Sequence, residues 1–430
     1  MNCIYKLVFL SAAIAIFAAS GALTMLAERA NQAKPEIVRV DKALDSLIAP
    51  GATIEKVAGG FKFTEGPMWR DGRLWISDVV GDKIFAVSPT GKTDLLLEKA
   101  GGYKDPPPDA YLGPNGMVTD KDGTVILAQQ GGRKLMRITE SGGGSSAGSL
   151  KMELFLDTFV GKKFNSPNDL EFALDGSLWF TDPSYGLAAG DKDPAKEIPF
   201  NGVYRYRNGK VAAVIKDLTL PNGIGFSPDG KTLYVSNSGP KMAVHQYRVA
   251  ADGSVTEGPI LITFPDGSGP GVPDGLKVDS AGNVWATAPG GIRIIAPDGK
   301  LLGQIKLPET AANLAWGDGG KALYIIVTIS SGLYLLIGMT RFSSKWILSH
   351  STWYKFRRSR HPRQCSLLRV SHQTWRKRVG VEPTGDIARG RPPVLKTGTI
   401  TGPHALPLFI YNNIHMVTKD FVPHLSLMVL

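Results

Sequence analysis

The sequence predicts an all-β protein, a six-bladed β-propeller, and three observations support this prediction. First, a segment made of a polar residue, an alternating strand, a turn and a second apolar strand occurs six times. The first polar residues of these copies, which we call the mouth residues, are Glu65, Asn115, Asn168, Asn222, Asp274 and Asn313. Second, they lie 50, 53, 54, 52 and 39 residues apart, close to the length of a four-stranded blade. Third, 50 glycines, 29 prolines and 20% charged residues are typical of a turn-rich β protein.

The order of segments also predicts how the ring closes. Within the copies, Asp175-Gly176 and Asp229-Gly230 separate two alternating runs, which is a strong signal for a hairpin. The sixth copy lacks an outer strand, and the segment 53–57 (TIEKV), ahead of the first copy, can supply it. Such a closure leaves no open sheet edge. We therefore expect the propeller to span residues 53–337, preceded by a linker over 31–52.

The N-terminal residues 1–30 are interpreted as a signal peptide or a membrane anchor. An uncharged run occupies residues 7–26, which is long enough to cross a bilayer if it is not removed. Small residues around 18–22 and 27–30 offer cleavage points, so we favour a signal peptide. The protein is then exported, periplasmic or secreted, and contacts a membrane only if this segment stays uncleaved. Cys3 and Cys365, both outside the repeats, exclude a disulfide framework.

The C-terminal residues 338–430 differ in composition from the repeats. From Met339 onward there are 15 Lys and Arg but 3 Asp and Glu, so the whole basic excess of the chain belongs to this tail. Runs such as 355–363 and 375–378 can be interpreted as an RNA-binding arm. The stretch 378–407 instead looks like translated non-coding sequence, which is the interpretation we favour. We expect the tail to be disordered and the propeller to have no nucleic-acid partner.

The mouth residues predict a cation site. Inner strands of a propeller line its central channel, so residues at their starts converge. Oxygen groups of Glu65, Asn222 and Asp274 would suit a hard cation such as Ca²⁺, Mg²⁺ or Mn²⁺. Any single Asn-Gly or Asp-Gly is more often a turn former than a ligand. Glu65 is the exception, because Glu is a poor turn former yet replaces Asn or Asp in the repeat.

Five motifs occur in order along the repeats: EGP at Glu65, SPND at 166–169, TDPSYG at 181–186, PNGIGFSPD at 221–229 and PDGLKVD at 273–279. Together they resemble the gluconolactonase and senescence marker protein (regucalcin) family of calcium-dependent propeller lactonases, over residues 54–336. The resemblance implies one divalent cation, Ca²⁺ first, with Mg²⁺, Mn²⁺ or Zn²⁺ as alternatives. It also implies that Glu65, Asn222 and Asp274 hold this cation, with Asn168 reaching the metal or its water and the substrate. It further implies that Asn115 and Tyr185 contact a small sugar lactone, although an ordinary turn and a rim aromatic are equally open interpretations.

The implied reaction is hydrolysis of the lactone. A bound cation polarises the carbonyl group and the attacking water, and because calcium does this weakly, a carboxylate base is still needed. We expect Asp274 to be that base.

Other functions remain as alternatives. No GxSxG motif occurs, and His245 is far in sequence from every mouth residue, so a Ser-His-Asp hydrolase is not expected and His245 should pack in its sheet. A propeller that binds a sugar acid or a protein around a structural calcium is the main alternative. Paraoxonase-like or strictosidine-synthase-like ester chemistry is another.

Overall fold

The computed structural model describes residues 34–107, 110–140, 149–265, 269–328 and 332–339, together with the backbone of 353–358 and 365–370. The predicted signal or anchor segment lies outside these residues. No helix within the described ranges is long and apolar enough to cross a membrane. The chain divides into two units, Met1–Ile347 and Leu348–Leu430, which are described separately.

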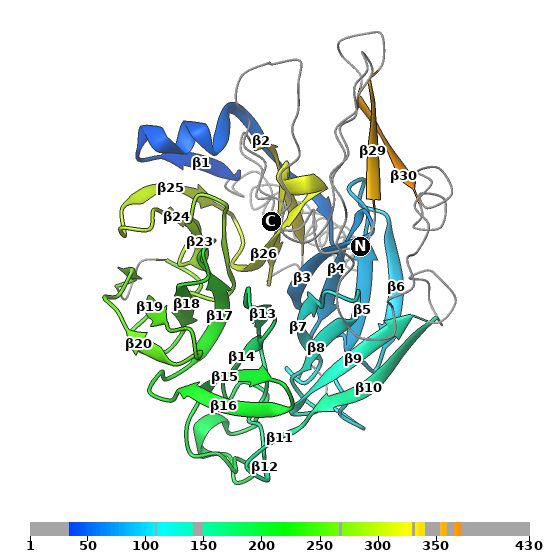
Figure 1. The fold of residues 1–430 in the computed structure, drawn as a ribbon, viewed down its shortest axis with the longest axis vertical. Coiled ribbons are helices and arrows are strands. Elements are labelled where there is room, and N and C mark those ends of the chain that lie inside the picture. Colours follow the sequence, from blue (N-terminus) through cyan, green and yellow to red (C-terminus); the bar gives the residue numbers. More distant parts are fainter. Residues whose placement is uncertain are drawn as a thin grey trace, which may run out of the picture. The chain divides into compact units, whose positions relative to one another are not determined.

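The described residues of the first unit form six antiparallel blade sheets and one separate two-stranded hairpin, which confirms the predicted six-bladed propeller (Figure 1). Blade 1 consists of β3 (Thr64–Arg70), β4 (Arg73–Asp78), β5 (Lys83–Val87) and β6 (Thr93–Glu98). Blade 2 consists of β7 (Pro114–Thr119), β8 (Val125–Gln129), β9 (Lys134–Glu140) and β10 (Leu150–Leu156). Blade 3 consists of β13 (Leu170–Phe172), β14 (Leu178–Asp182), β15 (Gly202–Arg207) and β16 (Lys210–Ile215). Blade 4 consists of β17 (Pro221–Phe226), β18 (Thr232–Asn237), β19 (Ala243–Val249) and β20 (Val255–Glu257), with β21 (Ile262–Thr263) also paired to β19. Blade 5 contains β22 (Leu276–Val278), β23 (Val284–Ala288), β24 (Gly291–Ile295) and β25 (Leu301–Lys306). Blade 6 contains β26 (Ala311–Gly317), β27 (Ala322–Val327) and β28 (Leu333–Met339). Short elements outside the blades are the hairpin of β11 (Thr158–Phe159) and β12 (Lys162–Lys163) and the 3-10 turns η1 (Lys42–Ser46), η2 (Gly190–Lys192) and η3 (Asp318–Gly320).

The first strand of each blade faces the centre of the ring. Each inner strand contacts the next one around the ring, and the last contacts the first. In order, these strands are β3, β7, β13, β17, β22 and β26. Figure 1 shows this arrangement around one centre. The mouth residues therefore lie at or just before the starts of six neighbouring strands, as the repeat predicts.

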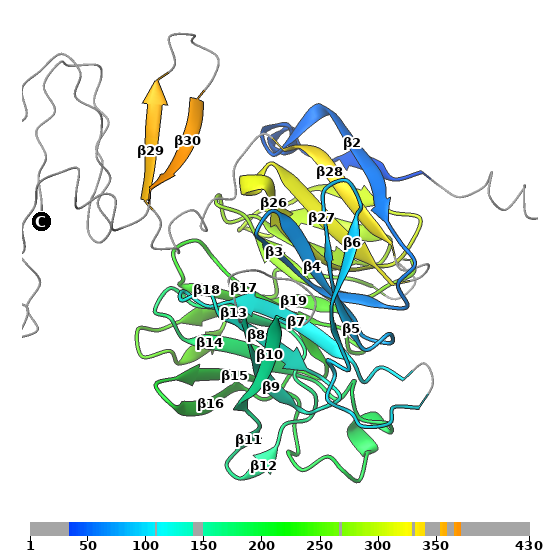
Figure 2. The ribbon, with the colours of Figure 1, turned by 90° about the vertical axis from the view of Figure 1, so that its right-hand side faces the viewer.

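The ring closes with the N-terminal strand β2 (Ile48–Ala58). It pairs with β28, with Thr53 opposite Ile337 and Lys56 opposite Tyr334, and Figure 2 shows the two strands side by side. The predicted closing strand 53–57 is therefore confirmed, although β2 begins earlier than expected.

The predicted linker over 31–52 is wrong for most of its length. In addition to the start of β2, it contains β1 (Glu36–Arg39), which pairs with β25 as a fifth strand of blade 5. Arg39 also donates hydrogen bonds to the backbone carbonyls of Ile48 and Ala49. This pairing could not be predicted from the repeat, because blade 5 already has four strands of its own.

Asp-Gly turns and buried tryptophans explain the regularity of the blades. Gly176 and Gly230 have φ values of 78° and 71°, which glycine adopts without strain, and Asp175 accepts a hydrogen bond from the Ser177 backbone N–H. The second strands of blades 1, 3 and 5 carry Trp75, Trp179 and Trp285, each almost fully buried. Each such ring removes a large apolar surface from water, so these positions hold neighbouring sheets together.

In the second unit the structure describes the backbone of two antiparallel strands, β29 (Trp353–Arg358) and β30 (Cys365–Val370). Residues 340–352, 359–364 and 371–430 lie outside the described residues. Disorder of those residues therefore stays a prediction.

Candidate functional site

Backbone contacts between blades hold the mouth residues close together. The N–H of Gly116 donates to the Asn168 carbonyl at 2.8 Å, and the N–H of Gly223 donates to the Asp274 carbonyl at 2.9 Å. A glycine follows the mouth residue in these copies because a side chain would not fit. A Cβ on Gly66, for example, would lie 2.1 Å from the Asn115 carbonyl oxygen. These contacts pack Glu65 against Asn115, Asn115 against Asn168 and Asn222 against Asp274.

Two carboxyl groups meet at this mouth, those of Glu65 and Asp274. Glu65 is only 3% exposed, and its Oε2 accepts hydrogen bonds from the Gly66 N–H at 3.0 Å and from Asn313 Nδ2 at 3.2 Å. Burial, reinforced by the charge of Asp169, raises the pKa of Glu65 to about 7. Burial and then the charge of Glu65 raise the pKa of Asp274 well above its usual value. Their ionised forms are unfavourable in this site unless a positive charge compensates them.

Asn222 and Tyr185 complete this side of the mouth. Asn222 Nδ2 donates to Ser238 Oγ at 3.2 Å, and the Tyr185 hydroxyl hydrogen-bonds with Ser238 and Asn222. Burial and the nearby Asp274 raise the pKa of Tyr185. The structure therefore brings Tyr185 into contact with Asn222 and close to Asp274, although it lies in a loop distant in sequence from both.

Asn168 and Asn115 lie in the same ring with different surroundings. Asn168 is buried, and its backbone N–H donates to the Thr181 carbonyl at 2.9 Å. Asn115 Nδ2 donates to Gln130 Oε1 at 2.9 Å. Its Oδ1 is buried and has no hydrogen-bond partner among the described residues. The Asn115 side chain therefore has an amide oxygen available for a ligand.

Asp169 is a third carboxylate at this site that the sequence analysis missed. It is 4% exposed, raises the pKa values of both Glu65 and Asp274, and its Oδ2 lies 4.0 Å from Lys277 Nζ. That oxygen has no hydrogen-bond partner among the described residues. A signal was present, because glycine follows the mouth residue in four copies whereas Asp169 follows Asn168.

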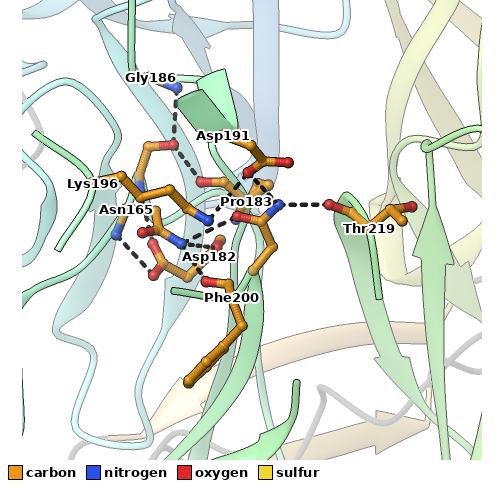
Figure 3. Close-up of polar contacts among 10 residues, drawn as sticks. Asn165, Asp182, Pro183, Gly186, Asp191, Lys196, Phe200 and Thr219 are labelled. Carbon is orange, nitrogen blue, oxygen red and sulfur yellow. Dashed lines mark hydrogen bonds and ion pairs between the residues drawn. The ribbon is translucent and has the colours of Figure 1, made fainter. Parts of the chain in front are cut away.

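A buried polar network fixes the two loops that carry Asn168 and Tyr185 (Figure 3). Asp182 accepts hydrogen bonds from the backbone N–H groups of Asn165 at 2.9 Å and Ser166 at 2.7 Å. Ser166 Oγ donates to the Pro183 carbonyl at 2.6 Å and accepts from the Gly186 N–H at 2.9 Å. These contacts join residues 165–166 to residues 182–186 on either side of Tyr185. The segment 182–186, which carries Tyr185, is therefore held in a fixed position beside the mouth residues.

The far end of the same loop is fixed as well. Asn165 Nδ2 donates to the Phe200 carbonyl at 2.9 Å, and Asn201 Nδ2 donates to Asp191 Oδ1 at 2.9 Å and to the Thr219 carbonyl at 2.6 Å. Lys196 pairs with Asp191 at 3.2 Å. Burial raises the pKa of Asp182 to about 7, but all of its described contacts are structural.

The donor set fits a hard divalent cation. The ionised carboxylates of Glu65 and Asp274 repel one another at the mouth, and the amide oxygen of Asn115 is buried without a partner. Within the described ranges no three His, Cys, Asp or Glu side chains form a metal cluster by themselves. A cation here would therefore need amide oxygens together with the two carboxylates, which is an oxygen-only set of the kind that Ca²⁺ accepts.

His245 lies away from this mouth, in β19, the third strand of blade 4. Its ring stacks on Tyr247 with a centroid separation of 6.4 Å, and burial lowers its pKa. The predicted packing of His245 within its sheet is confirmed.

Comparisons with known proteins agree with this geometry. Residues 63–329 match the family model described as SMP-30/Gluconolactonase/LRE-like region. A gluconolactonase of Zymomonas mobilis is 34% identical over 67% of this chain and 83% of its own length. The solved structure of a gluconolactonase from Xanthomonas campestris is 28% identical, with a TM-score of 0.59 over 70% of this chain and 94% of that chain. A calcium-binding regucalcin of Agrobacterium tumefaciens, 17% identical with a TM-score of 0.50 over 66% of this chain and 96% of that one, shares the fold. The chain therefore belongs to the SMP-30/gluconolactonase/LRE-like family and is a gluconolactonase-like enzyme.

Proposed function

We propose that this protein hydrolyses a sugar lactone at the mouth of the propeller with the help of one divalent cation, Ca²⁺ in the first place. The observation that carries the proposal is the pair of buried carboxyl groups of Glu65 and Asp274. Burial and the charge of Asp169 raise the pKa of Glu65, and burial and the charges of Glu65 and Asp169 raise the pKa of Asp274. The named relatives, a gluconolactonase of Zymomonas mobilis and one of Xanthomonas campestris, support the substrate class.

Glu65, Asn222 and Asp274, with Asn168 beside them, would hold the cation. When bound, the cation would polarise the lactone carbonyl and lower the pKa of the attacking water. Asn115 and Tyr185 would hydrogen-bond hydroxyl groups of the substrate. The free amide oxygen of Asn115 among the described residues and the nearness of Tyr185 to Asn222 and Asp274 support this assignment. The buried network around Asp182 and Ser166 holds Tyr185 in place for this contact.

Asp274 is the proposed base. It takes a proton from the water whose oxygen bonds to the carbonyl carbon of the lactone. The bond between that carbon and the ring oxygen then breaks, and the ring oxygen accepts a proton and becomes a hydroxyl group. The product is the open hydroxy acid. General-base assistance of this kind is worth about 10²- to 10⁴-fold in rate.

The test compares chelated and calcium-loaded protein, wild type and Glu65→Gln, on glucono-1,5-lactone and a small lactone panel. We expect turnover that needs the cation and is lost in Glu65→Gln. A folded, cation-loaded protein that opens no lactone would instead favour a binding module with a structural calcium.

We also propose export of the protein, on the strength of the uncharged run over residues 7–26. Cell fractionation with N-terminal sequencing of the mature chain tests this. Recovery of intact, uncleaved protein in the cytosolic fraction would contradict it.

A further inference from the structure

Two aromatic rings lie close to the mouth and take no part in the proposed reaction. Tyr111 is 51% exposed, and its ring meets that of Phe63 edge-to-face, with centroids 4.9 Å apart and planes at 81°. Large aromatic side chains are usually buried in this protein, as Trp75 and Trp179 are. An edge-to-face contact covers at most one face of Tyr111, so much of its ring is open to solvent.

The sequence places both rings within reach of the site. Phe63 precedes Glu65 by two residues, so their Cα atoms are at most about 7 Å apart. Tyr111 precedes Asn115 by four residues and is linked to it through side chains. Gln130 Nε2 donates to the Tyr111 carbonyl at 2.6 Å, and Gln130 Oε1 accepts from Asn115 Nδ2. The backbone that carries Tyr111 is therefore tied to the mouth residue Asn115, and the Phe63 ring that Tyr111 contacts lies two residues from Glu65.

The backbone that carries Tyr111 cannot shift easily. A Cβ on Gly101 or Gly131 would lie 2.3 Å or 2.0 Å from the Leu112 carbonyl oxygen, and one on Gly113 would lie 2.0 Å from the carbonyl oxygen of Val79. These contacts pack the segment around residue 112 between the loops of blades 1 and 2. An exposed ring on a fixed backbone loses little entropy when a ligand binds, which favours binding.

We infer that Tyr111 and Phe63 form an outer subsite that binds a second sugar ring attached to the lactone, so that glycosylated aldonolactones are substrates. The inference rests on the proposed function. Aromatic faces pack against the apolar C–H face of a sugar ring, while a tyrosine hydroxyl can hydrogen-bond its hydroxyl groups. Lys104 and Asp105 of the same loop are exposed, and this polar surrounding suits a sugar better than an alkyl chain.

The experiment measures kcat/KM of the calcium-loaded full chain on glucono-1,5-lactone and on cellobiono-1,5-lactone. Tyr111→Ala should lower kcat/KM about tenfold on the disaccharide lactone, from the contact area lost, and change it less than twofold on glucono-1,5-lactone. Tyr103→Ala is the matched control. This tyrosine of the same loop is 46% exposed and should leave both values unchanged.

Equal effects of Tyr111→Ala on the two lactones, or no effect on either, would overturn the subsite. Turnover of neither lactone by wild-type protein would instead count against the proposed function. The subsite is then decided by calorimetry with cellobionate and gluconate. Weaker binding of cellobionate alone in Tyr111→Ala supports it, and unchanged binding refutes it.

Discussion

Replacing Glu65 by Gln should make the metal-free protein more stable at alkaline pH and leave it unchanged at acidic pH. Burial raises the pKa of Glu65 from 4.5 to about 7. Between these two values the folded protein holds a proton that the unfolded chain has released, so the free energy of unfolding falls as the pH rises. The loss is complete above pH 7 and amounts to about 3 kcal/mol.

The glutamine side chain keeps the shape of the neutral acid but cannot ionise. Its carbonyl oxygen can still accept the hydrogen bonds from Gly66 and Asn313 that Glu65 Oε2 accepts. After about 1 kcal/mol for burying the amide group, the net gain at pH 8.5 is about 2 kcal/mol. For a domain of this size that corresponds to an increase in Tm of about 4 °C. At pH 5 the two proteins should have nearly the same Tm.

The assay is thermal unfolding followed by circular dichroism, in chelator, at pH 5.0 and pH 8.5. Glu55→Gln, on the exposed face of β2, is the control and should show no pH-dependent gain. With saturating calcium the order should reverse, because wild-type protein gains the binding free energy of the cation. A Glu65→Gln protein that is no more stable than wild type in chelator at pH 8.5 would refute the reasoning.

Three further changes test other parts of the site. Asp274→Asn should lower kcat/KM at least about 100-fold, and full activity with the cation retained, measured by calorimetry, would exclude Asp274 as the base. Ser166→Ala leaves the Gly186 N–H and the Pro183 carbonyl buried without their partner. It should lower the free energy of unfolding, measured by urea titration, by about 2 kcal/mol. A loss below about 0.5 kcal/mol would show that the loop is held by other contacts. Gly66→Ala places a Cβ 2.1 Å from a backbone oxygen and should lower the free energy of unfolding by more than about 3 kcal/mol. The control Gly72→Ala is also at positive φ but has open space around it, and should lower the free energy of unfolding by about 1 kcal/mol. Equal losses would mean that backbone strain, not packing at the mouth, decides the effect.

The ring and its mouth residues could be predicted because they repeat. Copies 2 and 4 make the same backbone contact, from the Gly116 N–H to the Asn168 carbonyl and from the Gly223 N–H to the Asp274 carbonyl, so a sequence period becomes a spatial ring. Glu65 is the one mouth residue that is neither Asn nor Asp, and in the structure it is a buried carboxylate at the mouth. By contrast, β1 carries no repeat signal, since it extends a blade that is already complete.

The loops could not be predicted, because their paths depend on side chains that are far apart in sequence. Asn165 contacts Asn201, 36 residues later, and this contact helps to fix the loop that carries Tyr185. The backbone carbonyl of Tyr111 is held by the side chain of Gln130, 19 residues later. Neither pair forms a motif. Substrate recognition therefore depends on the least periodic part of the chain, which agrees with the general role of loops on a rigid scaffold.

Asp169 shows why one divalent cation suits this mouth. Glu65, Asp274 and Asp169 influence one another electrostatically, and Lys277 is the basic side chain that faces Asp169 Oδ2 and also lowers the pKa of Glu65. With all four groups ionised their formal charges sum to about −2, and unpaired charge at a buried site is unfavourable. A divalent cation cancels this charge, whereas a monovalent ion leaves one carboxylate uncompensated. The charge of the cation therefore follows from the whole group of side chains, Asp169 and Lys277 included, and not from the ligands alone.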